Sequence, residues 1–189
     1  SLASSILIDH NTFDDCAANS CVVVGQPATI SNNTFHAQIA RRVFNFVQVQ
    51  TGTSGSPAAT MIVNNSMVAV DIGAGSRGTV TTYAVTEAVS VYTGTAQVSN
   101  NTITRTGHAV GAGVLGGLSA TVTFTDNIVT TVATPFSGTG QLNGAAVITA
   151  NWNDLRDYFS AFGTTVALNV SALNLRCNWW GAVTGPSNM

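Results

Sequence analysis

Few residues in this sequence are capable of acid–base chemistry. The 189 residues include eight Asp or Glu, three His and six basic residues, all of them arginine. A pair of carboxylates can act as general acid and base on a glycosidic bond, or can bind calcium through their oxygen atoms. The best local pair is Asp14 and Asp15, which lie close to His10 in the sequence. These three residues are therefore the candidate catalytic residues.

The sequence contains no complete motif for a metal ion or a cofactor. His10, His36 and His108 have no spacing typical of a zinc site. The glycines of 111–116 have the spelling of a dinucleotide-binding loop, but no acidic residue follows at the required distance and no alternation of strands and helices surrounds them. We therefore expect no metal site and no cofactor.

The scarcity of charge excludes several classes of protein. Only 7% of the residues are charged, against about 25% in an ordinary soluble domain. The net charge of −2 excludes a basic nucleic-acid binder and a polybasic membrane ligand. A hydrophobic content of 45% argues against disorder. The uncharged stretch 106–125 is long enough to cross a bilayer, but its five glycines and several hydroxyl groups indicate that it does not.

One repeated template organises the whole chain. It consists of an apolar residue, two variable residues, Asn, one variable residue and a second apolar residue, as in Ile8–Phe13. Its asparagines are Asn11, Asn33, Asn65, Asn101, Asn127, Asn151 and Asn178, spaced 22, 32, 36, 26, 24 and 27 residues apart. Three short strands with their turns need about 20–25 residues, so each copy predicts one coil of a β-solenoid.

The recurrent Asn has a physical role in such a coil. We expect it to occupy a left-handed bend between strands, which Asn tolerates better than any residue except Gly. Stacked from coil to coil, the side-chain amides would bond to one another as a ladder, with apolar flanks such as Ile8 and Phe13 pointing inward. A β-sandwich with Asn-Asn-Thr loops is the alternative, which the repeated apolar flanks disfavour.

One segment departs from the strand pattern. Residues 154–162 have apolar residues at helical spacing, with Asn153 as the N-cap and Gly163 at the end. They predict a short amphipathic helix that packs beside the penultimate coil or shields its open end.

Cysteines and glycosylation sequons point to the secretory pathway. Cys16 and Cys21 flank a short loop, and we expect a local disulfide, with two buried thiols as the alternative. Cys177 is left over. The sequons have their acceptors at Asn32, Asn64, Asn100 and Asn169. Three of these acceptors precede a ladder Asn and can face solvent, so one interpretation is a row of glycans along one edge. The competing interpretation is an Asn-Asn-Thr turn that carries no glycan.

The chain resembles a known group of proteins. Its segment 177–187, with the letters CNWWGAVTGPS, is similar to the NWWG…GP segment near the end of right-handed parallel β-helix domains in secreted and surface proteins. The Asn-Thr-Phe and Asn-Thr-Ile repeats resemble the pectate-lyase-like β-helix repeat over essentially the whole chain. The amino-acid composition, which lacks lysine and is rich in Val, Thr, Ala and Asn, resembles that of the dispersed-gene-family surface glycoproteins of trypanosomatids. The resemblance implies a right-handed parallel β-helix of about seven coils.

These observations together predict one domain and one class of function. Residues 1–189 are expected to form a single β-helix domain, either the C-terminal coils or a fragment of a longer solenoid. We expect an extracellular or cell-surface structural or adhesive solenoid without catalysis, such as an adhesin, stalk or filament component. Its partner would be a surface glycan, a protein ligand or a second copy joined end to end, with no nucleic acid and no membrane span. The insertions at 50–59 and 73–78 are the expected contact loops.

An enzyme is the alternative function. Polysaccharide lyases and glycoside hydrolases occur on the fold that the resemblance implies, and they place several carboxylates on one face. In this sequence the carboxylates fall at different positions of the template, so only Asp14, Asp15 and His10 are grouped.

Overall fold

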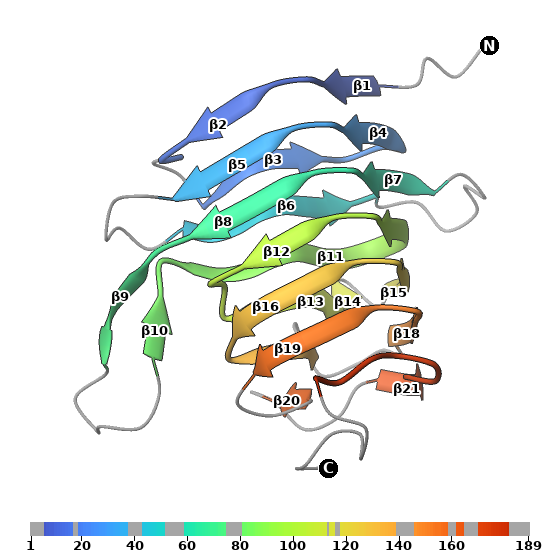
Figure 1. Ribbon diagram of the computed structural model, residues 1–189. Coiled ribbons are helices and arrows are strands. Elements are labelled where there is room, and N and C mark those ends of the chain that lie inside the picture. The colour runs from blue at the N-terminus through green and yellow to red at the C-terminus, as the bar shows by residue number, and fades with distance from the viewer. Residues whose placement is uncertain are drawn as a thin grey trace, which may run out of the picture.

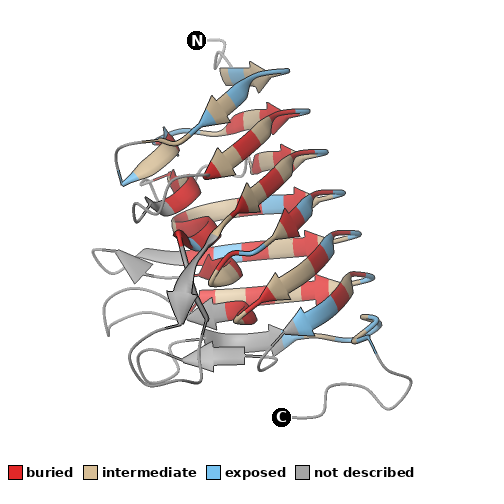
Figure 2. Ribbon diagram, turned by 60° about the vertical axis from the view of Figure 1, so that its left-hand side comes forward, coloured by how far each residue is buried: buried red, intermediate tan, exposed pale blue. Residues whose placement is uncertain are grey.

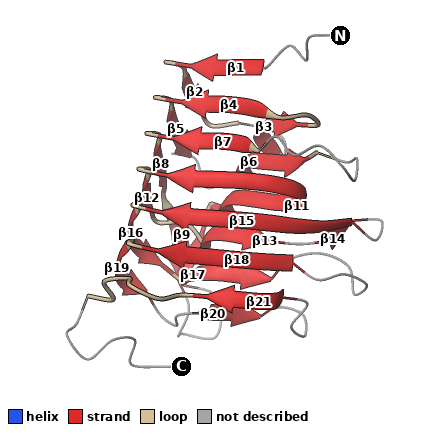
Figure 3. Cartoon of the chain, turned by 90° about the vertical axis from the view of Figure 1, so that its right-hand side faces the viewer, coloured by secondary structure: helices blue, strands red, loops and turns tan. Residues whose placement is uncertain are grey.

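The structure, a computed structural model, is an all-β stack. It describes residues 6–16, 19–37, 43–51, 59–74, 81–112, 114–115, 118–138, 146–158, 162–164 and 170–181. These residues form strands and turns and include no helix (Figures 1 and 3). Apart from two short antiparallel pairs, the strands pair in parallel with the equivalent strand of the next coil, which is the arrangement of a parallel β-solenoid.

The strands stack into three faces, which the chain visits in turn. Face 1 consists of β1 (Ile6–Asp9), β4 (Ala28–Ser31), β7 (Thr60–Val63), the second half of β11 (Val85–Ser99), β15 (Leu118–Thr125), β18 (Ala146–Asn151) and β21 (Val170–Asn174). Face 2 consists of β2 (Thr12–Asp14), β5 (Thr34–Ala37), β8 (Ser66–Ala69), β12 (Thr102–Thr104), β16 (Ile128–Val132) and β19 (Asp154–Tyr158).

Face 3 completes each coil. It consists of β3 (Ser20–Val24), β6 (Val43–Gln50), the first half of β11, β13 (His108–Ala112), β17 (Thr134–Gly138) and β20 (Phe162–Thr164). Two antiparallel pairs stand apart from this order: β9 (Asp71–Ala74) with β10 (Thr81–Tyr83), and β14 (Val114–Leu115) with β15. The predicted contact loops at 50–59 and 73–78 lie mostly outside the described residues.

β11 passes from face 3 to face 1 without interruption, and Gly94 makes this possible. Gly94 has φ +88°, a conformation that side chains disfavour. A Cβ atom at this position would lie 1.7 Å from Oγ1 of Thr51. The sharp corner therefore requires glycine on both conformational and steric grounds.

The core consists of apolar side chains stacked in register. On face 2 the inward column is Phe13, Phe35, Met67, Ile103, Val129 and Leu155. On face 1 it is Ile8, Ile30, Ile62, Val98, Phe124 and Ala150. The rings of Phe13 and Phe35 lie parallel at 4.8 Å, which is the spacing of adjacent strands. Figure 2 shows the resulting alternation of buried and exposed positions along the coils. Each fully buried side chain of this kind contributes about 2 kcal/mol of hydrophobic stabilisation.

The bend between faces 1 and 2 differs from the prediction. The residues in the left-handed conformation are those before each ladder Asn: His10, Asn32, Asn64, Asn100, Asp126, Trp152 and Cys177, with φ between 54° and 61°. The ladder Asn itself is not left-handed. A second left-handed position, four residues after the ladder Asn, is occupied by Asp15, Arg105, Thr131 and Asp157.

The helix predicted over 154–162 is wrong. Asp154–Tyr158 is strand β19, which pairs in parallel with β16, and Phe162 begins strand β20. Leu155 occupies the inward column and is completely buried. The requirement that each coil continue the stack therefore overrides the local helical spacing of the apolar residues.

Candidate functional site

A ladder of hydrogen-bonded asparagines runs along the bend between faces 1 and 2. The backbone N–H and the side-chain Nδ2 of Asn65 both donate to Oδ1 of Asn101, at 2.9 and 3.0 Å. Nδ2 of Asn65 also donates to the carbonyl oxygen of Ile30 at 2.9 Å. The same pattern joins Asn11, Asn33, Asn65, Asn101, Asn127, Asn153 and Asn178. The buried amides of the ladder thus satisfy one another from coil to coil.

The ladder position predicted at Asn151 is a misassignment by two residues. Asn153 accepts from Asn127 and donates to Asn178, whereas Asn151 ends strand β18. The sequence offers two asparagines here, and only Asn153 has an apolar residue, Leu155, two places later to fill the inward column. The remaining ladder asparagines of the sequence prediction take part in the observed bonds.

Three of the predicted glycosylation acceptors lie at the left-handed bend. Asn32, Asn64 and Asn100 are exposed, and each precedes a ladder Asn. Nδ2 of Asn32 donates to a carboxylate oxygen of Asp9 at 2.9 Å. The fourth acceptor, Asn169, lies outside the described residues. The three described acceptors therefore form a solvent-facing row with one acceptor per coil.

Asp9 is the centre of a hydrogen-bonded cluster at one end of the stack. Oγ of Ser31 donates to it at 2.5 Å, and Nδ1 of His10 lies 2.6 Å from its second oxygen. The hydrogen bonds from Ser31, Asn32 and His10 lower the pKa of the Asp9 carboxyl to about 2. This carboxylate is therefore ionised and held at ordinary pH, which does not suit a general acid.

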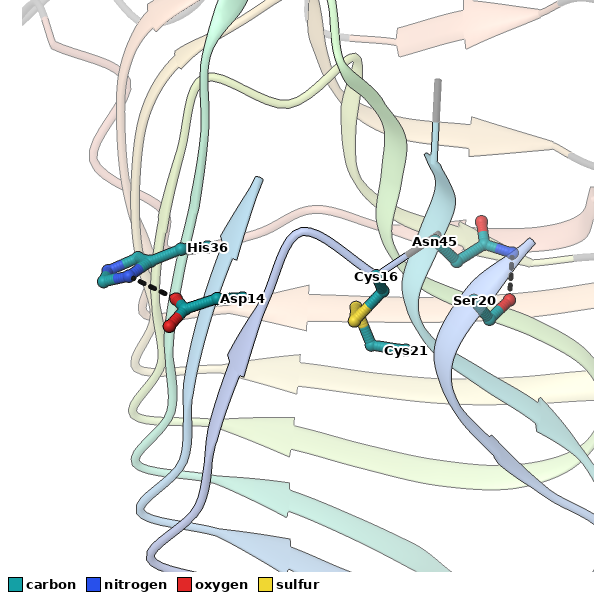
Figure 4. The surroundings of a disulfide bond; sticks show 6 residues. All are labelled: Asp14, Cys16, Ser20, Cys21, His36 and Asn45. Carbon is teal, nitrogen blue, oxygen red and sulfur yellow. Dashed lines mark hydrogen bonds and ion pairs between the residues drawn. A yellow bond between two sulfur atoms is a disulfide. The ribbon is translucent and has the colours of Figure 1, made fainter. Parts of the chain in front are cut away.

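The predicted catalytic residues engage different partners. Asp14 pairs with His36, its register partner on the outer side of face 2, at 3.2 Å (Figure 4). His10 is engaged with Asp9, and Asp15 occupies a left-handed turn. The side-chain contacts thus place His10 and Asp14 in separate exposed interactions, one with Asp9 and the other with His36.

Cys16 and Cys21 form a disulfide at the start of face 3 (Figure 4). Their Cα atoms are 5.3 Å apart, so the bond closes the short loop before β3. Next to it, Oγ of Ser20 donates to the side-chain oxygen of Gln48 at 2.8 Å. Cys177 is a free and exposed thiol.

A mostly buried polar column on face 3 escaped the sequence prediction. Register pairing aligns Asn45, Glu87, His108 and Thr134 on successive strands. Glu87 is only 4% exposed, and its carboxylate atoms lie 2.4–2.6 Å from the position that a Cβ of Gly111 would take, so only glycine leaves room for it there. Burial lowers the pKa of His108, which also hydrogen-bonds Oγ1 of Thr134. A possible signal in the sequence was Glu87 itself, a single Glu within a β-branched run.

A second feature that the sequence did not predict is an aromatic cleft. It has a volume of about 410 Å³ and is lined by Trp152, Asn153, Asp154, Arg156, Cys177 and Trp179. The two indoles are 68% and 46% exposed, respectively. Arg156 donates from Nε to Oδ1 of Asp154 at 2.7 Å and from Nη2 to Oδ2. Exposed aromatic surface beside oriented polar groups is typical of a ligand site.

The described residues contain no cluster of three or more His, Cys, Asp or Glu suited to a metal ion. Nor do they include a helix with the length and hydropathy needed to cross a membrane. In comparisons with known proteins, no protein-family model, curated protein or solved structure matches this chain.

Proposed function

We propose that the protein is an extracellular or cell-surface β-solenoid with a structural and adhesive role and no catalytic activity. In this proposal residues 1–189 form a single right-handed parallel β-helix of about seven coils, serving as an adhesin, stalk or filament component. The observation that carries it is the buried Asn ladder, which joins coil to coil by two bonds at each step. A ladder of this kind favours a straight stack that lengthens by about 4.8 Å per coil.

The outward residues support an exposed role. Outer positions of face 2 carry Thr12, Thr34, Ser66 and Thr102 in register, which bring polar groups to the surface without charge. The disulfide between Cys16 and Cys21 favours an oxidising compartment. The exposed row of sequon acceptors fits the same compartment. The partners proposed for this surface are a glycan, a protein ligand or a second copy joined end to end, without nucleic acid.

A carbohydrate-active enzyme is the second candidate, and one observation favours it. Glu87, which is buried, and His108 are register neighbours on face 3, and a neighbouring carboxyl and imidazole are the groups that acid–base enzymes use. The enzyme receives less support from Asp14, Asp15 and His10, because His10 bonds Asp9 and Asp14 bonds His36.

The two functions differ in whether a bound polysaccharide is cleaved. The protein would be incubated with neutral and acidic polysaccharides, with and without calcium, measuring both retention and the release of reducing ends or unsaturated products. We expect retention without release. Product formation would establish the enzyme instead, provided that Glu87→Gln or Asp15→Ala abolishes it. The turn variant Asp126→Asn is the control and should keep the activity. The adhesive role would be refuted if the protein binds to none of the polysaccharides, proteins or host-cell surfaces and does not self-associate.

A further inference from the structure

The geometry points to the cleft between Trp152 and Trp179 as a binding site for a neutral saccharide. This inference rests on the proposed adhesive function and deepens it, because it names the contact point and the chemical class of the ligand. It depends on three observations: the conformation of Trp152, the placement of Trp179, and the ion pair of Asp154 with Arg156 in the same cleft.

Trp152 is unfavourable for folding in two respects. It has φ 61°, a left-handed conformation in which a bulky side chain is a genuine outlier. It is also 68% exposed, so its indole gains little from burial. The equivalent bends carry His10, Asn32, Asn64, Asn100, Asp126 and Cys177, all smaller and mostly polar. A residue that costs conformational energy and leaves apolar surface in water suggests a role other than stability.

Strand pairing places Trp179 on the coil that follows Trp152. The N–H of Trp179 donates to the carbonyl oxygen of Asn153, and the N–H of Leu155 donates to the carbonyl oxygen of Trp179, both at 2.8 Å. This parallel bridge sets Trp179 in register with Asp154, on the outer side of face 2. One indole therefore comes from the bend and the other from the next coil, and both line the same cleft.

The polar groups of the cleft are oriented and electrically balanced. Asp154 and Arg156 occupy alternate positions of β19 and hold each other by two hydrogen bonds. Arg156 keeps further N–H donors, and each Asp154 oxygen keeps a lone pair. The pair has no net charge, so it does not select an anion or a cation.

A sugar ring fits this combination better than other ligands. The C–H faces of a pyranose stack on an indole, whose face is apolar and electron-rich. Adjacent hydroxyls both donate and accept, and so can bond Asp154 and Arg156 together. The cleft is a shallow, open depression of about 410 Å³, on which one sugar ring can lie. A purely apolar ligand would make no hydrogen bonds to the ion pair. A phosphorylated ligand would place its negative charge beside the Asp154 carboxylate.

The test uses neutral gluco-, galacto- and manno-oligosaccharides, with saturation-transfer NMR and tryptophan fluorescence as readouts. Trp152→Asn restores the residue type usual at this bend. We expect its Tm to equal or exceed that of the wild type while saccharide affinity falls at least tenfold. Leu7→Asn, which removes a 65% exposed apolar side chain at the far end, is the matched control and should bind normally. Bound saccharide should also slow alkylation of Cys177, which lines the cleft.

The possible outcomes separate this inference from the proposed function. Saccharide binding that persists in Trp152→Asn would overturn the cleft and leave the adhesive role intact. A lower Tm for Trp152→Asn, without saccharide binding by the wild type, would assign the tryptophan a structural role and also overturn the cleft. Binding of peptides but of no saccharide would overturn the proposed ligand chemistry. Cleavage of a saccharide that still requires Trp152 would support the cleft and refute the non-catalytic role.

Discussion

Asn127 donates both its backbone N–H and its side-chain Nδ2 to Oδ1 of Asn153, at 2.9 and 3.0 Å. Asn153 in turn donates to the carbonyl oxygen of Phe124 at 2.8 Å and to Oδ1 of Asn178 at 2.9 Å. These contacts connect three successive coils through one buried amide. A polar side chain thus performs at this bend the role that apolar stacking performs on the faces.

Replacing this amide should be costly. Asn153→Ala leaves the buried backbone N–H of Asn127 without its acceptor and removes the side-chain donor to the carbonyl oxygen of Phe124 and to Oδ1 of Asn178. We therefore expect a loss of about 4 kcal/mol in the free energy of unfolding. Asn151→Ala is the matched control. The Asn151 amide, in the orientation that satisfies it, donates only to the carbonyl oxygens of Arg176 and Ala150, and we expect a loss of about 1 kcal/mol. Urea denaturation measures both. Equal losses would contradict the ladder assignment.

Any side chain at position 94 should destabilise the corner between faces 3 and 1. Gly94→Ala places a Cβ 1.7 Å from Oγ1 of Thr51 in a backbone conformation of φ +88°. We expect a loss of about 3 kcal/mol or more, only partly recovered by adding Thr51→Ala. Gly25→Ala is the control, since a Cβ there meets nothing within 4 Å, and its stability should change by less than about 0.5 kcal/mol. Thermal unfolding of the three variants would show the contrast.

The Asp9 cluster should make stability depend on acid pH. The folded-state pKa of Asp9, about 2, is below the ordinary value of 3.8, so the unfolded chain binds the proton first as the pH falls. The contribution of Asp9 is complete above pH 3.8 and is lost as the pH falls through 2. We expect the urea midpoint of the wild type to drop more between pH 5 and about 2 than that of Asp9→Asn. Ser31→Ala, which removes the largest cause of the shift, should be intermediate. Identical slopes would refute the assignment.

Thr131 should be a site of easy stabilisation. It is β-branched, yet it has φ 55° at the second bend, where Asn would be less strained. We expect Thr131→Asn to increase the free energy of unfolding by about 1 kcal/mol. Thr130→Asn is the adjacent control: it breaks the 3.1 Å contact between the hydroxyls of Thr130 and Thr104 and should lower stability. A destabilised Thr131→Asn would indicate that the hydroxyl of Thr131 is needed in the folded state.

The sequence predicted the stack because its period is set by backbone geometry. Each coil repeats the same inward pair, as at Ile30 and Phe35, so the pattern survives insertions of any length between copies. It failed near Asn151, where Asn-Trp-Asn offers two registers and Ala150 is a weak apolar marker. It also placed the left-handed bend one residue too late, since both residues of Asn-Asn-Thr tolerate that conformation.

The two polar features outside the ladder had no local signature. Glu87 and His108 become neighbours only through strand register, which depends on the length of every intervening turn. The same holds for Trp152 and Trp179: Trp152 is exposed at a bend, and Trp179 is exposed in register with Asp154 of the neighbouring coil. Residue types alone could not distinguish these tryptophans from Trp180, which packs against the core.

The ladder has a direction, because each Asn donates to the next one and accepts from the one before. At one end, Oδ1 of Asn11 accepts no hydrogen bond from any described residue. At the other, the backbone N–H of Asn178 donates to none of them. The row therefore has chemical polarity: only a donor can extend it beyond Asn11, and only an acceptor beyond Asn178. Two stacks joined through this row must meet head to tail, since two like ends offer the same group.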